Sequence, residues 1–119
     1  MEVHQVSFAT IKVLNPNLGE VIVDEGVEVN VNMVTEIHEK FIAIFQSSFS
    51  LLINKKNAYS TQLDALIKFG DLSAIDKIAI YAPNQLAKMS ADFSATIPSS
   101  ANLNIEVFTE RDAALAWLF

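Results

Sequence analysis

The stretch FTERDAALAWLF, residues 108–119, joins the end of a strand to the start of a helix. Phe108 closes an apolar run, and Thr109 is of the residue type that caps helix N-termini. Asp112 follows three residues later and completes the pattern of a capping box. Small and apolar side chains then dominate to the end of the chain. We therefore predict a short helix after Thr109 that docks on the preceding strand.

Working outward from this stretch, apolar runs of strand length alternate with helical patterns. The clearest helical pattern has apolar residues at three- and four-residue steps, at Val34, Ile37, Phe41, Ile44 and Phe45. Predicted strands cover 6–14, 20–23, 49–53, 75–82 and 103–108. Predicted helices run from Asn30 or Asn32 to Phe45, from the cap Ser60-Thr61 to Gly70, from Pro83 to Pro98, and after Thr109.

The predicted order is β-β-α-β-α-β-α-β-α. Helices that alternate with short apolar strands favour a largely parallel sheet with right-handed crossovers, to which the opening hairpin adds an antiparallel strand. We find no linker, internal repeat or low-complexity segment in the 119 residues. We therefore expect one α/β domain over residues 1–119.

This element order and the ending Thr-x-x-Asp-Ala-Ala-Leu-Ala-Trp-Leu of residues 109–118 resemble the STAS domains of the SpoIIAA-like group. The resemblance implies a five-stranded mixed sheet. It also implies the role of an anti-sigma-factor antagonist, which is a regulatory protein that binds a kinase-like anti-sigma factor.

In those antagonists, the turn after the central strand carries Asp-Ser-Ser/Thr-Gly-Leu, and the partner kinase phosphorylates its second hydroxyl. The matching residues here are YSTQL, 59–63, which place Thr61 at the phospho-acceptor position and Ser60 beside it. The turn departs from the motif in two places, because Tyr59 replaces the Asp and Gln62 replaces the Gly. The alternative is that Ser60 and Thr61 only cap the next helix.

Lys55, Lys56 and Asn57 precede this turn, and with Tyr59 they form a candidate contact for a partner or an anion. Ligands of open α/β sheets gather beyond the carboxyl ends of the strands, where this loop is expected. A solvated connection between strand and helix is the alternative.

Composition excludes several other functions. The chain carries 14 acids against 8 bases, a net charge of −6, which disfavours nucleic acid and anionic membranes as partners. It has no cysteine, which removes thiolate chemistry and fits a cytoplasmic protein. No apolar run is long enough to cross a membrane.

No catalytic, cofactor or metal residue is predicted. The acids Asp24, Glu25 and Glu28 lack the spacing of a calcium loop. His4, in the frayed start, and His38, on an exposed helix face, are far apart in sequence. The sequence also lacks a Gly-x-Ser-x-Gly elbow and a Gly-rich phosphate loop.

We therefore expect a non-enzymatic, cytoplasmic domain for regulatory protein–protein interaction, with contacts at residues 55–63. The alternative is a domain that binds a small molecule or lipid, which predicts an apolar cavity between sheet and helices. If Met89 and Phe93 are exposed, a homodimer or a ligand groove on the third helix is also expected.

Overall fold

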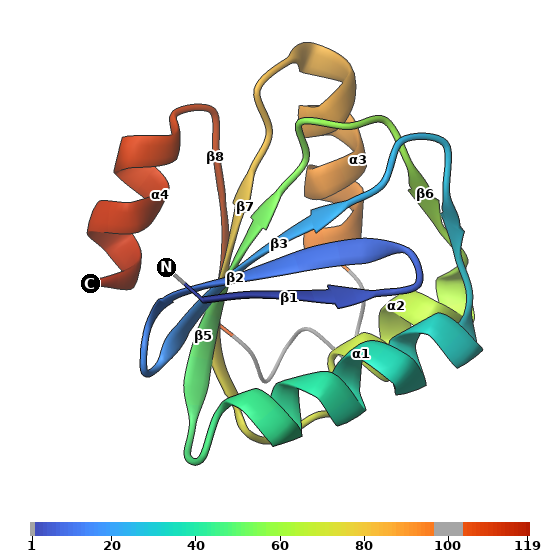
Figure 1. Cartoon of the computed structure of the whole chain (residues 1–119). Helices are drawn as coiled ribbons and strands as arrows, with labels where there is room; N and C mark the ends of the chain where they lie inside the picture. The colour runs from blue at the N-terminus through green and yellow to red at the C-terminus, as the bar shows by residue number, and fades with distance from the viewer. Residues whose placement is uncertain (1, 97–103) are drawn as a thin grey trace.

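The computed structural model describes residues 2–96 and 104–119. In this part of the chain the main sheet has six strands in the order β1-β2-β3-β5-β7-β8 (Figure 1). Their bounds are Glu2–Val6, Ala9–Asn15, Leu18–Val23, Phe49–Asn54, Ile75–Tyr81 and Asn104–Phe108. Strands β1, β2 and β3 pair antiparallel, while β3, β5, β7 and β8 pair parallel. The predicted mixed sheet is confirmed.

The sixth strand is β1, so the expectation of five strands and of a frayed start around His4 was wrong. Residues 2–6 pair with residues 9–13 across a tight turn. Most of β1 is exposed because it is the edge strand and only one neighbour covers it. Its sequence therefore lacks the apolar run by which the inner strands are recognised.

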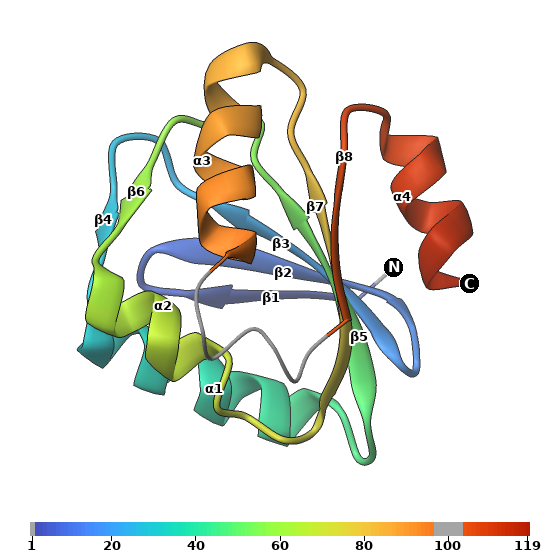
Figure 2. The ribbon, with the colours of Figure 1, turned by 180° about the vertical axis from the view of Figure 1, so that it is seen from behind.

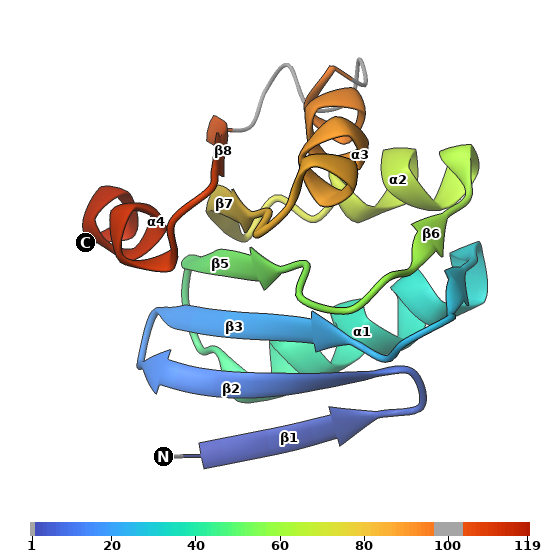
Figure 3. The same ribbon diagram turned by 90° about the horizontal axis from the view of Figure 1, so that it is seen from above.

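Four helices in the described residues cover the sheet, and their bounds are Val31–Ile44 for α1, Leu63–Phe69 for α2, Gln85–Ala95 for α3 and Arg111–Leu118 for α4. Helices α1, α2 and α3 lie on one face, and α4 lies alone on the other (Figure 3). The predicted alternation of strands and helices is confirmed. The predicted residues 97–98 of the third helix and Leu103 of the last strand lie outside the described residues.

The larger core lies between the sheet and the three helices. Its aromatic centre is Phe41, Phe45 and Phe49, with the Phe45 and Phe49 rings stacked 4.5 Å apart. Gly19 lets this stack approach the sheet, because a Cβ there would lie 2.9 Å from the Phe45 ring. The smaller core, on the α4 face, is built on Leu52, Ala79 and Ala114.

One predicted helix start is confirmed and three are wrong. Asn30 caps α1 by accepting from the Met33 N–H at 3.0 Å. Helix α3 was expected to begin at Pro83, but its N-cap is Asn84 and its first residue is Gln85. Helix α4 instead begins after Glu110, without a side-chain cap from Thr109. Ser60-Thr61 likewise does not cap α2, whose N-cap is Gln62.

The reason for the error at α2 is a small parallel sheet that the sequence did not indicate. Residues Ser60–Thr61 form β6 and pair with β4, Glu28–Val29. The Ser60 N–H donates to the Val27 carbonyl and the Gln62 N–H to the Val29 carbonyl, both at 3.0 Å. The two strands lie beside each other at one end of the molecule, next to the start of α2 (Figure 2). Pairing of the backbone thus holds this segment in an extended conformation.

Candidate functional site

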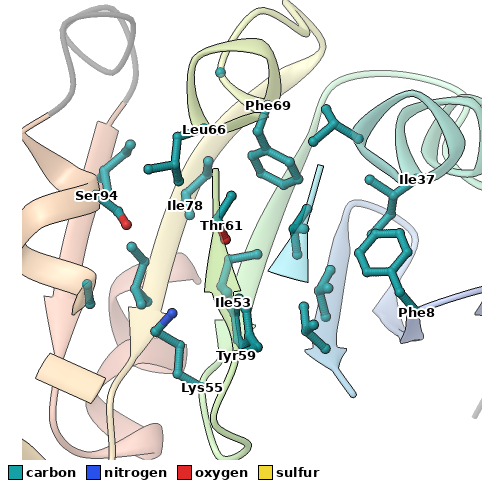
Figure 4. A pocket seen from close by; sticks show the side chains of 18 residues that line it. Phe8, Ile37, Ile53, Lys55, Tyr59, Thr61, Leu66, Phe69, Ile78 and Ser94 are labelled. Carbon is teal, nitrogen blue, oxygen red and sulfur yellow. The ribbon is translucent and has the colours of Figure 1, made fainter. Parts of the chain in front are cut away.

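A cavity of about 110 Å³ lies between the main sheet and the three helices. Its lining is mostly aliphatic and aromatic and comes from strands, helices and the 55–61 connection (Figure 4). Its apolar lining includes Phe8, Ile37, Phe69, Ile53 and Ile78 (Figure 4). The predicted alternative of a ligand-binding domain required such an apolar space, and the structure contains one.

Few polar side chains line this cavity: Lys55, Tyr59, Thr61 and Ser94. Lys55 is only 9% exposed, and its Nζ lies 4.0 Å from the centre of the Tyr59 ring. Burial lowers the pKa of Lys55 to about 8, because the charged ammonium is poorly solvated. Burial also raises the pKa of Tyr59, so the phenol stays neutral.

The position of Lys55 follows from the alternation of strand β5. Asn54, the last residue of β5, turns to the α4 face and donates to Glu20 Oε2 at 2.9 Å. Lys55 comes next, and its backbone N–H donates to the Tyr81 carbonyl at 2.9 Å. Successive side chains of an extended chain point to opposite faces, so Lys55 faces the three helices. Its nitrogen is turned toward the cavity in Figure 4.

The remaining predicted contact residues border a second hollow of about 230 Å³ on the surface. Lys55, Lys56, Asn57 and Tyr59 meet the start of α3 there, including the exposed Leu86. The structure therefore brings the predicted loop residues together and adds a helix that the sequence did not associate with them. Their role in binding stays a prediction.

The same loop is anchored by the acidic turn at residues 24–28. Glu25 Oε2 accepts from the Ala58 N–H at 2.6 Å, and the Asn57 side chain donates to the Val23 carbonyl at 2.9 Å. Through its hydrogen bond, Glu25 holds the loop in place. Among the described residues no group of three or more His, Asp or Glu side chains could hold a metal.

The two candidate phospho-acceptors differ in accessibility. Ser60 is exposed, whereas Thr61 is half-buried and lines the apolar cavity. Both lie in β6, directly before the N-cap Gln62, so neither caps α2, contrary to the sequence-based interpretation. Phosphorylation of either residue stays a prediction.

His38 and helix α3 also bear on the sequence-based expectations. His38 is half-buried, with its Nε2 3.2 Å from the Phe69 carbonyl oxygen, so its expected exposure was wrong.

Helix α3 exposes a stripe at Leu86, Met89 and Phe93, with 75%, 61% and 53% of these residues accessible. The condition under which a homodimer or ligand groove was expected is therefore met.

Sequence reasoning missed an ion pair on the opposite face, between a buried carboxylate and a partly exposed arginine. Glu20, 2% exposed, accepts from Arg111 Nη2 at 2.6 Å and from Nε at 3.1 Å. Burial alone would raise the pKa of Glu20, but the hydrogen bonds from Arg111 and Asn54 outweigh it, so the pKa lies below its ordinary value. The one available signal was an acid at an inward position of the strand EVIV, since its partner lies 91 residues away.

The fold, the parallel central strands and the terminal helix define an α/β domain of the STAS type. The family model named SpoIIAA-like matches residues 5–119, so the chain belongs to the SpoIIAA-like family. The resemblance drawn from the element order and from residues 109–118 is thereby confirmed. Neither the search of curated proteins nor that of solved structures found a match.

Family membership supports a regulatory domain similar to the anti-sigma-factor antagonists. In the described residues no helix is long and apolar enough to span a membrane.

Proposed function

We propose that this regulatory domain is non-enzymatic and binds a small, largely apolar molecule in the cavity between the sheet and helices α1, α2 and α3. The observation that carries this proposal is the apolar cavity itself. Protein interiors are close-packed and hold few voids larger than a water molecule. A space of about 110 Å³ with so few polar groups fits a small organic ligand better than a cluster of waters. A cytoplasmic location remains part of the proposal.

The test uses neutral probes and a variant that fills the space. Ala91 is fully buried and lines the cavity from α3, so Ala91→Leu places a larger side chain there. Ala113 is exposed on α4, and Ala113→Leu is the matched control. We expect benzene and cyclohexane to shift NMR signals of cavity residues in the wild type and the control, but not in a folded Ala91→Leu protein. Equal responses in all three proteins would contradict the proposal.

A second candidate function is regulation through a protein partner. Family membership and an exposed apolar surface on α3 both support it. The stripe of Leu86, Met89 and Phe93 continues from the hollow bordered by Lys56 and Tyr59. Apolar patches beside charged residues are typical of protein interfaces. We propose a kinase-like anti-sigma factor as the partner, as the resemblance implies, with a homodimer as the alternative.

Phosphorylation would act on this surface by charge. Ser60 is the better acceptor because it is exposed, and phosphate would add nearly two negative charges. Ser60→Asp and Thr61→Asp proteins should therefore lose binding to the native partner. Leu86→Glu should lose it too, whereas Ile42→Glu, at an exposed site on α1, should not.

The measurement is affinity purification of each tagged variant from the native cells, with mass spectrometry of bound proteins and of residues 57–68. Wild-type binding by the Asp variants would contradict the phosphorylation switch. Analytical ultracentrifugation separates a heterologous partner from a second copy of the chain.

A further inference from the structure

Lys55 is a buried cation that forms no ion pair in the described residues. In the part of the chain that the structure describes, the ion pairs join His4 to Glu2, Lys88 to Asp92, and Arg111 to Glu20. None of them involves Lys55. No hydrogen bond from its Nζ is formed within the described residues either. Its polar contact is with the face of the Tyr59 ring. A buried ammonium in such surroundings is costly unless a counter-charge joins it.

The geometry gives this cation access to the cavity. Lys55 lines both the apolar cavity and the surface hollow, so it stands where the two adjoin. Its nitrogen is turned inward, between Tyr59 and the α3 side that carries Ser94 (Figure 4). Thr61 and Ser94 add hydroxyl groups to an otherwise apolar lining. The space thus combines one positive charge, a few neutral hydrogen-bonding groups and an aliphatic wall.

We infer that the cavity takes a small monocarboxylate, whose carboxylate pairs with the Lys55 ammonium while its hydrocarbon body fills the apolar space. This inference rests on the ligand-binding function proposed above and names the ligand class. The volume suits a body of about six carbon atoms, since an engineered cavity of similar size holds benzene.

Other anions fit this environment less well. A phosphate monoester carries between one and two negative charges at neutral pH, and the lining offers one cation to meet them. A nucleotide would also bring a sugar and several polar groups into an apolar space, at the cost of their hydration. A single carboxylate matches the single ammonium. Because the pKa of Lys55 is about 8, most of the amine is charged at neutral pH.

The experiment compares hexanoate with its neutral isostere hexanamide by isothermal titration calorimetry at pH 7, with NMR titration to locate the site. The proteins are wild type, Lys55→Met and Lys40→Met, the last removing a charge on α1 that lines neither the cavity nor the surface hollow. We expect wild type and Lys40→Met to bind hexanoate at least about tenfold more tightly than hexanamide. Lys55→Met should bind the two equally and keep its affinity for hexanamide.

The experiment distinguishes failure of the carboxylate inference from failure of the ligand-binding function. If wild type binds hexanamide in the cavity as tightly as hexanoate, the carboxylate inference falls and the ligand-binding function stands. If wild type binds neither compound, both fall. A preference for hexanoate that persists in Lys55→Met also overturns the inference.

A pH titration of the wild type keeps the test decisive if Lys55→Met does not fold. Affinity for hexanoate should fall above pH 8 as Lys55 loses its proton, while affinity for hexanamide stays constant. The other titratable groups around Lys55 are Tyr59, Lys56 and Glu25, and the α3 residues that line the two hollows carry none. Hexanamide, which lacks the negative charge, is the control for titration of these groups, and a flat hexanoate profile would overturn the inference.

Discussion

Within residues 2–96 and 104–119, each face of the main sheet buries one charged group, and the two groups have opposite surroundings. On the α4 face, Glu20 receives two hydrogen bonds from Arg111 and one from Asn54. On the opposite face, Lys55 lies against the Tyr59 ring beside an apolar cavity. The carboxylate joins β3, β5 and α4 into one structure. In the described residues the ammonium forms no ion pair, which is why we propose that it meets the charge of another molecule.

The largest expected effect comes from breaking the paired charge. Arg111→Met should lower the free energy of unfolding by about 3 kcal/mol, because Glu20 is left buried without its cation. Chemical denaturation measures this loss, and the double variant Glu20→Gln/Arg111→Met should recover most of it. If Arg111→Met lowers the free energy of unfolding no more than an ordinary surface substitution does, the proposed difference between the two faces is wrong.

Removing the unpaired charge should have the opposite sign. Lys55→Met should raise the free energy of unfolding of the ligand-free protein by about 1–2 kcal/mol, because an uncompensated buried charge is replaced by an apolar side chain of similar shape. Lys56→Met, at an exposed site, should change it by less than about 0.5 kcal/mol. Destabilisation by Lys55→Met in chemical denaturation would mean that Lys55 has a structural role.

The pH dependence sharpens this second comparison. Below pH 8 Lys55 is charged in both states and its burial cost is fully present. Between pH 8 and the unfolded value of about 10.4, the unfolded chain binds more protons, so this contribution to stability rises with pH. The stability difference between Lys55→Met and wild type should therefore shrink over this range. Parallel denaturation curves at pH 7, 9 and 10.5 measure it, and a constant difference would contradict the lowered pKa.

The smallest effect is expected on the outer side of α3. Met89→Ser should change the free energy of unfolding by less than about 0.5 kcal/mol, because Met89 is largely exposed. Leu115→Ser on α4 should cost more, since Leu115 packs against the small core on the other face. Thermal unfolding measures both, and a large loss for Met89→Ser would mean that the α3 stripe is packed in the folded monomer.

Local sequence patterns predicted most of the fold. The apolar spacing of Val34, Ile37 and Phe41 identified α1, and all three are buried. The short apolar runs identified the inner strands. The errors lie where tertiary contacts override local chemistry: β1 is held by one neighbour, and Ser60-Thr61 pairs with β4 although its hydroxyls suit a cap.

The candidate site was predicted in part. Lys55, Lys56, Asn57 and Tyr59 were singled out because they follow an inner strand, and they do border one hollow. The burial of Lys55 could not be predicted, because two adjacent lysines in a loop are usually both solvated. The contribution of α3 was also missed, since its residues lie about 30 positions further along the chain.

The sequence by itself determined the α/β class, the alternation of elements and the family, because hydrophobic periodicity and a terminal motif are local properties of the chain. Only the tertiary structure decided which charges are buried and whether they are paired. Glu20 meets Arg111 across 91 residues, and Lys55 meets the cavity because β5 ends where it does. The physical reason is that burial and pairing of charge depend on atoms brought together from distant segments, which periodicity does not encode.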